Sequence, residues 1–225
     1  MKLAHTNPSD AAYLGNLSHQ LSTMVDVAIT VGDTMLPAHS YVLAAASPVL
    51  EQQLASQSPD SIEDPDGKAI LYALDLTTDG EDCAKAALDY IYSMCPLKGA
   101  QPTIEWQEDA EHLANFGHRY KVNFLSTASD GFVHTMLKEE YQIVHHSSYH
   151  YNNSSLSKQE VMDCLPDVMR WAMLAASRGL PKVLDYCEKW LACNLKQYPE
   201  SYTHLQMLQN TSMVRILLMI RECVQ

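Results

Sequence analysis

The sequence predicts an α+β fold, in which a small sheet of three or four strands is covered by helices and followed by an all-α region. Two observations predict it. Val27, Ile29 and Val31 alternate with smaller or polar residues, and Gly32-Asp33 lies between two short runs, which is typical of a β-hairpin. The stretch from residue 157 onward opens with a helix-capping signature and continues with helical patterns.

The composition is that of an ordinary globular protein. With 225 residues, of which 47% are hydrophobic and 19% charged, the chain is long enough for two domains. Its formal charge of −12 argues against binding to nucleic-acid phosphates or to an anionic membrane surface. The six cysteines lack Cys-x-x-Cys spacing, and no targeting or membrane-spanning segment is recognisable, so we expect reduced thiols and a cytoplasmic or nuclear location.

An apolar stripe precedes the hairpin. The segment 7–10 is typical of a helix start, and Leu14, Leu17 and Leu21 then recur at spacings of three and four residues. The predicted helix packs either on its own domain or on the same helix of a second chain. We favour the contact between chains, because burial between identical patches gives a closed two-fold dimer.

The hairpin leads into two short helices. Val27, Ile29 and Val31 alternate along the first strand, Gly32-Asp33 suits a two-residue turn, and Pro37 is expected to end the second strand because it cannot donate a ladder hydrogen bond. The apolar run 41–46 predicts a buried helix. Ser47-Pro48 then predicts an N-cap and the first position of a second helix.

The rest of the first region alternates loop, strand and helix. Residues 56–68 are polar and proline-broken, which predicts a surface loop, and the β-prone run 69–76 predicts a third strand. The acidic cluster 79–82 favours a helix start because negative charge is stabilised there. Two further helices are expected at about 106–119 and 123–138.

The best domain boundary lies after these helices. Residues 141–153 are polar and irregular, and we place a linker at 139–156 between domains at 10–138 and 157–225. The linker contains His145, His146 and His150, which raises the possibility of a metal site. A solvated linker is the preferred interpretation, because no carboxylate or thiolate stands at ligand spacing, and we expect no metal.

The second region is predicted to be helical throughout. Ser157 and Glu160 form a capping box, and we expect Pro166 to limit this helix so that residues 167–178 form another. Gly179 then marks a helix end. Further helices are expected at about 181–196, 200–209 and 212–223.

No residue set predicts catalysis. Asp26, His39 and Ser47 have the residue types of a hydrolytic triad, but no nucleophile-elbow motif is present and Ser47 is already explained as a helix cap. Acidic side chains cluster on loops and helix starts, as on any solvated surface. No phosphate-binding glycine loop or dinucleotide fingerprint occurs, so we expect neither an enzyme nor a cofactor.

The order of elements resembles that of a BTB/POZ domain over about residues 10–138. The segments that carry the resemblance are Asp26-Val27, Ala38-His39, Val42-Leu43-Ala44-Ala45, Ser47 with Leu50 and Leu54, and Leu88-Asp89-Tyr90-Ile91-Tyr92. The helical C-terminal region is similar to the BACK region that follows many BTB domains. The resemblance implies that Asp26, His39 and Ser47 are structural residues.

The resemblance also implies partners. Many BTB domains form dimers, here through the helix with Leu14, Leu17 and Leu21, and many hold the type-3 cullin of a ubiquitin ligase. The positions that match the cullin surface are Leu50, Leu54, Trp106 and Glu108. The alternative keeps both leucines in the core and Trp106 as a lid. Transcription-factor members place a basic residue after the histidine, and Ser40 stands there in this chain, which argues against co-repressor recruitment.

The sequence therefore predicts a dimerising interaction module that recruits an unidentified client protein to a cullin-based ubiquitin ligase. A dimerisation scaffold without ligase attachment is the alternative, and a hydrolase is the third hypothesis.

Overall fold

The computed structural model describes residues 25–57, 62–63, 69–93, 104, 107–141, 157–195, 203, 205–208 and 210–222. Two compact units are present, residues 1–125 and 126–225, and each is described by itself. The first combines a sheet with helices and the second is helical in its described parts, which confirms the predicted α+β class with an all-α region after it. The predicted helix with Leu14, Leu17 and Leu21 lies outside the described residues.

A three-stranded sheet organises the first unit. Strands β1 (Val27–Val31) and β2 (Thr34–Ala38) form the predicted antiparallel hairpin, and β5 (Tyr72–Asp75) pairs with β1 in parallel, so that β1 is central. Gly32 in the turn has a φ of +59°, a conformation that glycine adopts without strain. The hairpin prediction is confirmed.

Two details of the strands differ from the prediction. β2 continues through Pro37 to Ala38, because β2 is an edge strand and a missing N–H is tolerated there. The stretch expected to be one strand at 69–76 is divided into β4 (Ala69–Ile70) and β5, and β4 pairs with β3 (Ile62–Glu63) inside the predicted loop.

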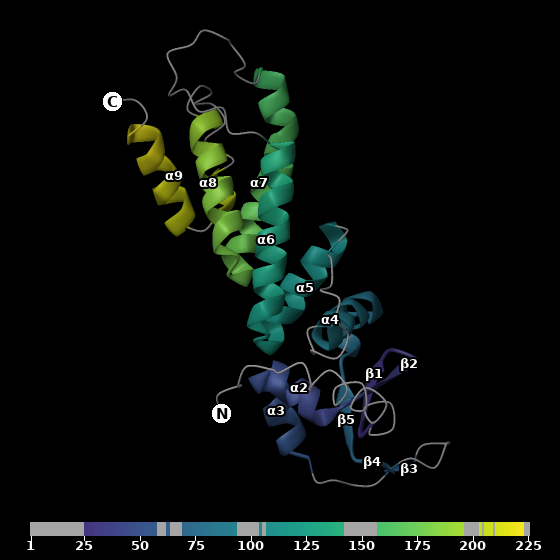
Figure 1. The fold of residues 1–225 in the computed structure, drawn as a ribbon. Helices are drawn as coiled ribbons and strands as arrows, with labels where there is room; N and C mark the ends of the chain where they lie inside the picture. The colour runs from purple at the N-terminus through teal and green to yellow at the C-terminus, as the bar shows by residue number, and fades with distance from the viewer. Residues whose placement is uncertain are drawn as a thin grey trace, which may run out of the picture. The chain divides into compact units, whose positions relative to one another are not determined.

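Helices lie beside the sheet in the first unit (Figure 1). They are α2 (Ser40–Ala46), α3 (Pro48–Ala55), α4 (Glu81–Ser93) and α5 (Gln107–Tyr120), with the 3₁₀ turn η1 (Thr77–Asp79) before α4. The predicted starts at Pro48 and in the 79–82 cluster are confirmed. One continuous core joins β1 to the inner faces of these helices, with Ile29, Leu43 and Phe116 fully buried.

The second unit is built from α6, α7, α8 and α9. α6 is Asn123–Glu140, so the division between the units falls inside this helix, and the predicted boundary at 139–156 stays a prediction. α7 (Lys158–Arg178) packs against α8 (Pro181–Leu195), and α8 packs against α9 (Asn210–Glu222), as Figure 1 shows. Trp171 and Trp190 are buried in its core.

The prediction that Pro166 divides two helices is wrong. α7 is one helix with Pro166 inside it. Buried side chains lie on both sides of the proline, among them Val161 and Leu165 before it and Val168 and Ala172 after it. Packing of this continuous apolar face against α8 outweighs the hydrogen bond that proline removes.

The ends of α7 follow the prediction. Ser157 and Glu160 form a full capping box, and Gly179 ends the helix with a φ of +73° in the left-handed region. Half of the residues of the helix expected at 200–209 lie outside the described residues, and residues 205–207 form a 3₁₀ turn. α9 begins at Asn210, two residues earlier than expected.

Candidate interaction site

Asp26 fixes the start of α2. Its Oδ1 accepts a hydrogen bond from the backbone N–H of Ser40 at 2.8 Å, and its Oδ2 accepts one from the Ser40 hydroxyl at 2.5 Å. The first turn of a helix has backbone N–H groups without helical partners, and a carboxylate satisfies one of them and is favoured by the helix dipole. Ser40, the residue after His39, therefore binds this aspartate through both its backbone N–H and its hydroxyl.

His39 is held by α4. Its side chain is buried, with 8% exposed, and its Nδ1 lies 2.9 Å from the hydroxyl oxygen of Tyr92. The same hydroxyl oxygen accepts the backbone N–H of His39 at 2.8 Å. Tyr92 therefore binds both the ring and the backbone at the junction of β2 and α2.

Ser47 joins α3 to the end of α5. Its Oγ accepts the Leu50 N–H at 3.0 Å, as an N-cap does, and donates to the carbonyl oxygen of Tyr120 at 2.5 Å. The side chain is fully buried. One hydroxyl therefore satisfies a donor of one helix and an acceptor of another.

Tyr120 and its neighbour Arg119 both bind Asp79 of η1. The Tyr120 hydroxyl donates to Asp79 at 2.7 Å, and Arg119 forms an ion pair with the same carboxylate. Burial of the phenol is the main reason that the pKa of Tyr120 is raised well above its usual range, and the hydrogen bond to Asp79 adds to this. The phenol therefore stays protonated and donates at neutral pH.

The structure does not bring Asp26, His39 and Ser47 together as a catalytic triad. Each binds a different partner, namely Ser40, Tyr92 and the Tyr120 backbone. A serine nucleophile needs a histidine within hydrogen-bond reach and an exposed oxyanion site, and the buried Ser47 has its hydroxyl committed to helix ends. These contacts are those of structural residues.

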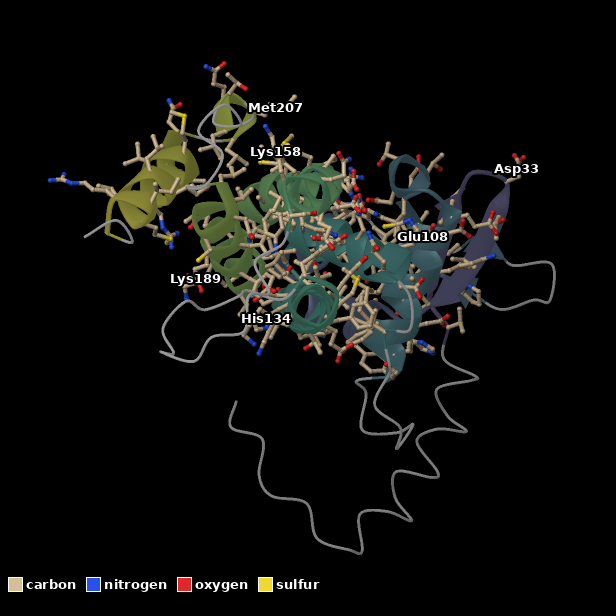
Figure 2. All side chains as sticks on the ribbon, turned by 90° about the horizontal axis from the view of Figure 1, so that it is seen from above. Asp33, Glu108, His134, Lys158, Lys189 and Met207 are labelled. Atoms are coloured by element: carbon tan, nitrogen blue, oxygen red, sulfur yellow. The ribbon has the colours of Figure 1, made fainter. Side chains whose placement is uncertain are left out.

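The residues proposed for the cullin surface are placed differently from one another. Leu50 is fully buried and Leu54 is 5% exposed, and both belong to the hydrophobic core. Glu108, labelled in Figure 2, is exposed in the first turn of α5. Trp106 lies outside the described residues. Their burial therefore supports the interpretation of Leu50 and Leu54 as core residues.

The exposed face of α3 is polar. Glu51, Gln52 and Gln53 are exposed between the buried leucines, and α3 contacts α5. Sequence reasoning did not single out these three residues. Helical periodicity would have found them, because they fall on the side of α3 opposite to Leu50 and Leu54.

Sequence reasoning also missed the partners of Asp26, His39 and Ser47. They are Ser40, Tyr92 and Tyr120, in that order. Tyr92 and Tyr120 are separated from the residues that they bind by 53 and 73 positions. No local pattern in the sequence carries such a signal.

His145, His146 and His150 lie outside the described residues, and within the described ones no cluster of three potential metal ligands occurs. Among the described helices, none is long and apolar enough to span a membrane.

Comparisons with known proteins agree with the predicted family. The model of the BTB/POZ domain family matches residues 15–137. The BTB domain of human gigaxonin is similar to this chain with 20% identity and a TM-score of 0.40, covering 59% of this chain and 98% of that one. The BTB domain of zebrafish PATZ1 is similar with 20% identity and a TM-score of 0.42, covering 60% and 99%. No curated protein sequence matches the chain.

The family model covers more than half of the 225 residues, and it spans Asp26 and Ser47, which form the hydrogen bonds described above. The chain belongs to the BTB/POZ family of protein–protein interaction domains.

Proposed function

We propose that the chain is a dimeric adaptor that recruits a client protein to a type-3 cullin ubiquitin ligase. The observation that carries the proposal is the BTB/POZ domain at residues 15–137, followed by a helical unit that offers a further binding surface. The contacts of His39 and Ser47 support a structural rather than a catalytic use of these residues, so the proposal assigns the chain no enzymatic activity. Such an adaptor acts in the cytoplasm or the nucleus.

The proposed cullin surface consists of the exposed face of α3 and the start of α5. Leu50 and Leu54 lie in the core on the buried side of α3, so they fix the position of the helix and do not contact the cullin themselves. In this proposal the cullin contacts Glu51, Gln52, Gln53 and Glu108 directly, together with Trp106. This face is acidic and polar, and it fits a partner surface that offers basic and hydrogen-bonding groups.

A binding measurement with the N-terminal region of a type-3 cullin tests the proposal. We expect a complex in isothermal titration calorimetry, weakened by Glu108→Lys and by Trp106→Ala. Asp33→Lys is the matched control, because Asp33 is exposed in the hairpin turn and is not part of the proposed surface (Figure 2). Leu54→Ala is unsuitable, because removal of a core side chain destabilises the fold itself. No binding by the intact chain rejects ligase attachment.

A dimerisation scaffold without ligase attachment is the second candidate. It is favoured by the absence of large apolar side chains from the exposed part of α3, since binding hot spots usually contain aromatic or apolar anchors. Light scattering is expected to show a dimer, and Leu17→Glu, within the predicted Leu14, Leu17 and Leu21 stripe, is expected to give a monomer. A dimer that does not bind the cullin identifies the scaffold, whereas a monomeric intact chain excludes both candidates.

A further inference from the structure

At the outer edge of β5 a side chain takes the place of a neighbouring strand. β5 is the last strand in the order β2-β1-β5, so one of its edges faces β1 and the other faces away from this sheet. The Ala73 N–H donates to Oε1 of Gln57 at 3.1 Å, and the Ala73 carbonyl oxygen accepts a hydrogen bond from Nε2 of Gln57 at 2.7 Å. Both outward backbone groups of Ala73 are therefore bound by one glutamine side chain.

A primary amide can replace a strand at one position because it carries an acceptor and a donor side by side. In an antiparallel pair of strands, two residues opposite each other exchange both N–H···O bonds. Gln57 makes the same two bonds with Ala73, at distances that are ordinary for N–H···O hydrogen bonds. Asparagine is one methylene group shorter and an ionised glutamate has no donor, so neither side chain reproduces the pair.

The end of α3 holds Gln57 at this edge. Gln57 follows Ser56, the C-cap of α3, and its backbone N–H donates to the carbonyl oxygen of Leu54 at 3.2 Å. Leu54 is buried in the core, and α3 contacts β5. The backbone of Gln57 is therefore fixed before its side chain binds Ala73, so only side-chain freedom is lost in forming the contact.

An open strand edge is a template for a second strand, because its N–H and C=O groups can pair with another chain. Edge strands are often protected by proline or lysine, and β5 contains neither. Ala73 has a small, exposed side chain that does not shield its backbone. The contact with Gln57 therefore competes with any strand that approaches Ala73.

A second copy of this chain fits the edge once the glutamine side chain withdraws. About a two-fold axis at Ala73, the two β5 strands run antiparallel, and the two Ala73 residues exchange both hydrogen bonds. Asp75 then lies opposite Leu71 of the second copy, so the two carboxylates do not face each other. Tyr72 lies opposite Leu74 of the second copy, and an aromatic and an aliphatic side chain are compatible neighbours.

We propose that Gln57 occupies a strand-pairing site on β5 and so prevents two copies of the chain from joining through this edge. The contact that it prevents is separate from the predicted helix with Leu14, Leu17 and Leu21. It also requires neither a cullin nor a client. Each copy carries one β5 edge, so the proposal holds for a monomeric and for a dimeric intact chain.

Sedimentation equilibrium of the full chain over a series of concentrations tests the proposal. We expect Gln57→Ala to raise the weight-average mass about twofold or more over that of the intact chain at the upper concentrations, because each edge contact joins two copies. Gln57→Asn is expected to do the same. Gln53→Ala is the matched control, because Gln53 is an exposed glutamine within α3 and its loss should leave the mass unchanged.

Two further variants separate this role from a simple attachment of α3 to β5. Gln57→Glu loses the donor and weakens the attachment, but it leaves a charge at the edge, so we expect no increase in mass. The double variant Gln57→Ala, Ala73→Lys is expected to return to the mass of the intact chain, because two lysines would lie directly opposite each other in the two-fold pair. Ala73 is exposed, so lysine at this position is compatible with folding.

Three results would overturn the proposal. An unchanged mass for Gln57→Ala, with circular dichroism like that of the intact chain, shows that Gln57 only attaches α3 to β5. An equal increase for Gln53→Ala or Gln57→Glu shows that association follows from any change at the end of α3. An increase that persists in the double variant with Ala73→Lys shows that the copies join elsewhere than at Ala73.

Discussion

Glu188 on α8 is wholly buried, and Arg215 on α9 places its Nη1 3.1 Å from the Oε2 of this carboxylate. Neither carboxylate oxygen has a hydrogen-bond partner in the described part of the chain. A buried charge is costly unless an opposite charge lies close to it. Arg215 therefore attaches α9 to α8 by compensating a charge that the core cannot solvate.

Removal of Arg215 is expected to destabilise the second unit. We predict that Arg215→Met lowers the free energy of unfolding by about 2 kcal/mol, because Glu188 is left buried and unpaired. The double variant Glu188→Met, Arg215→Met should lose less than about 1 kcal/mol, because the buried charge is gone. Urea unfolding followed by the fluorescence of Trp171 and Trp190 measures both.

Lys189→Met is the matched control for this pair. Lys189 pairs with Asp185 on the surface of α8, with side chains 52% and 45% exposed, and such pairs contribute about 0.5 kcal/mol or less. Equal losses in the single and double Arg215 variants would contradict the assigned role of Glu188.

Ser47→Ala is expected to destabilise the first unit by about 2 kcal/mol. The substitution removes the N-cap of α3 and leaves the carbonyl oxygen of Tyr120 without the Ser47 hydroxyl as its donor. Ser56→Ala is the control, because Ser56 is exposed and its hydroxyl donates only to the neighbouring carbonyl of Gln53. Circular dichroism during urea unfolding measures both, and a similar loss in the two variants would refute the bridging role of Ser47.

Two glycine substitutions are predicted to have opposite signs. Gly179→Ala should destabilise the protein by about 1 kcal/mol, because Gly179 ends α7 in the left-handed region with a φ of +73°. Gly131→Ala should stabilise it by about 0.5 kcal/mol, because Gly131 lies inside α6 and an added Cβ meets nothing within 4 Å. Thermal unfolding distinguishes them, and melting temperatures that move in the same direction would count against this backbone argument.

The Cys187 thiol is predicted to resist alkylation and to make stability depend on alkaline pH. Burial is the main reason that the pKa of Cys187 is raised to about 12, and the charge of Glu188 adds to it. Above about pH 9 the unfolded chain loses this proton while the folded chain keeps it. The contribution of the thiol to stability is therefore complete below about pH 9 and is lost as the pH rises toward 12.

Iodoacetamide labelling at pH 8.5 followed by mass spectrometry checks this prediction. Cys187 should stay unmodified in the folded protein and react after unfolding in urea, because the thiolate is the reactive form. Cys164, which is only partly buried, is the comparison within α7. Equal labelling of the two in the folded protein would show that Cys187 is accessible.

Local signals in the sequence predicted local structure well. The Gly32-Asp33 turn, the Ser47-Pro48 helix start and the Ser157–Glu160 capping box all depend on neighbouring residues, and the structure confirms each. The prediction failed at Pro166, where packing of the buried face of α7 against α8 outweighs the local preference of proline.

The candidate sites were less predictable than the fold. The sequence offered Leu50 and Leu54 both as a partner surface and as core, and their burial, which depends on packing of α3 against β5 and α5, supports the core. The apolar cavity lined by Leu165, Met169 and Met173 of α7 also includes Met207, which stands 34 residues or more from these residues in the sequence. No periodicity connects positions so far apart.

The sequence by itself determined the family, the hairpin and the places where most helices begin and end, because turn geometry and helix capping act over a few residues. Only the tertiary structure decided that Asp26 binds Ser40, that Tyr92 holds His39 and that Arg215 compensates Glu188. These contacts join separate elements, and their free energy depends on desolvation and close approach that exist only after the chain has packed.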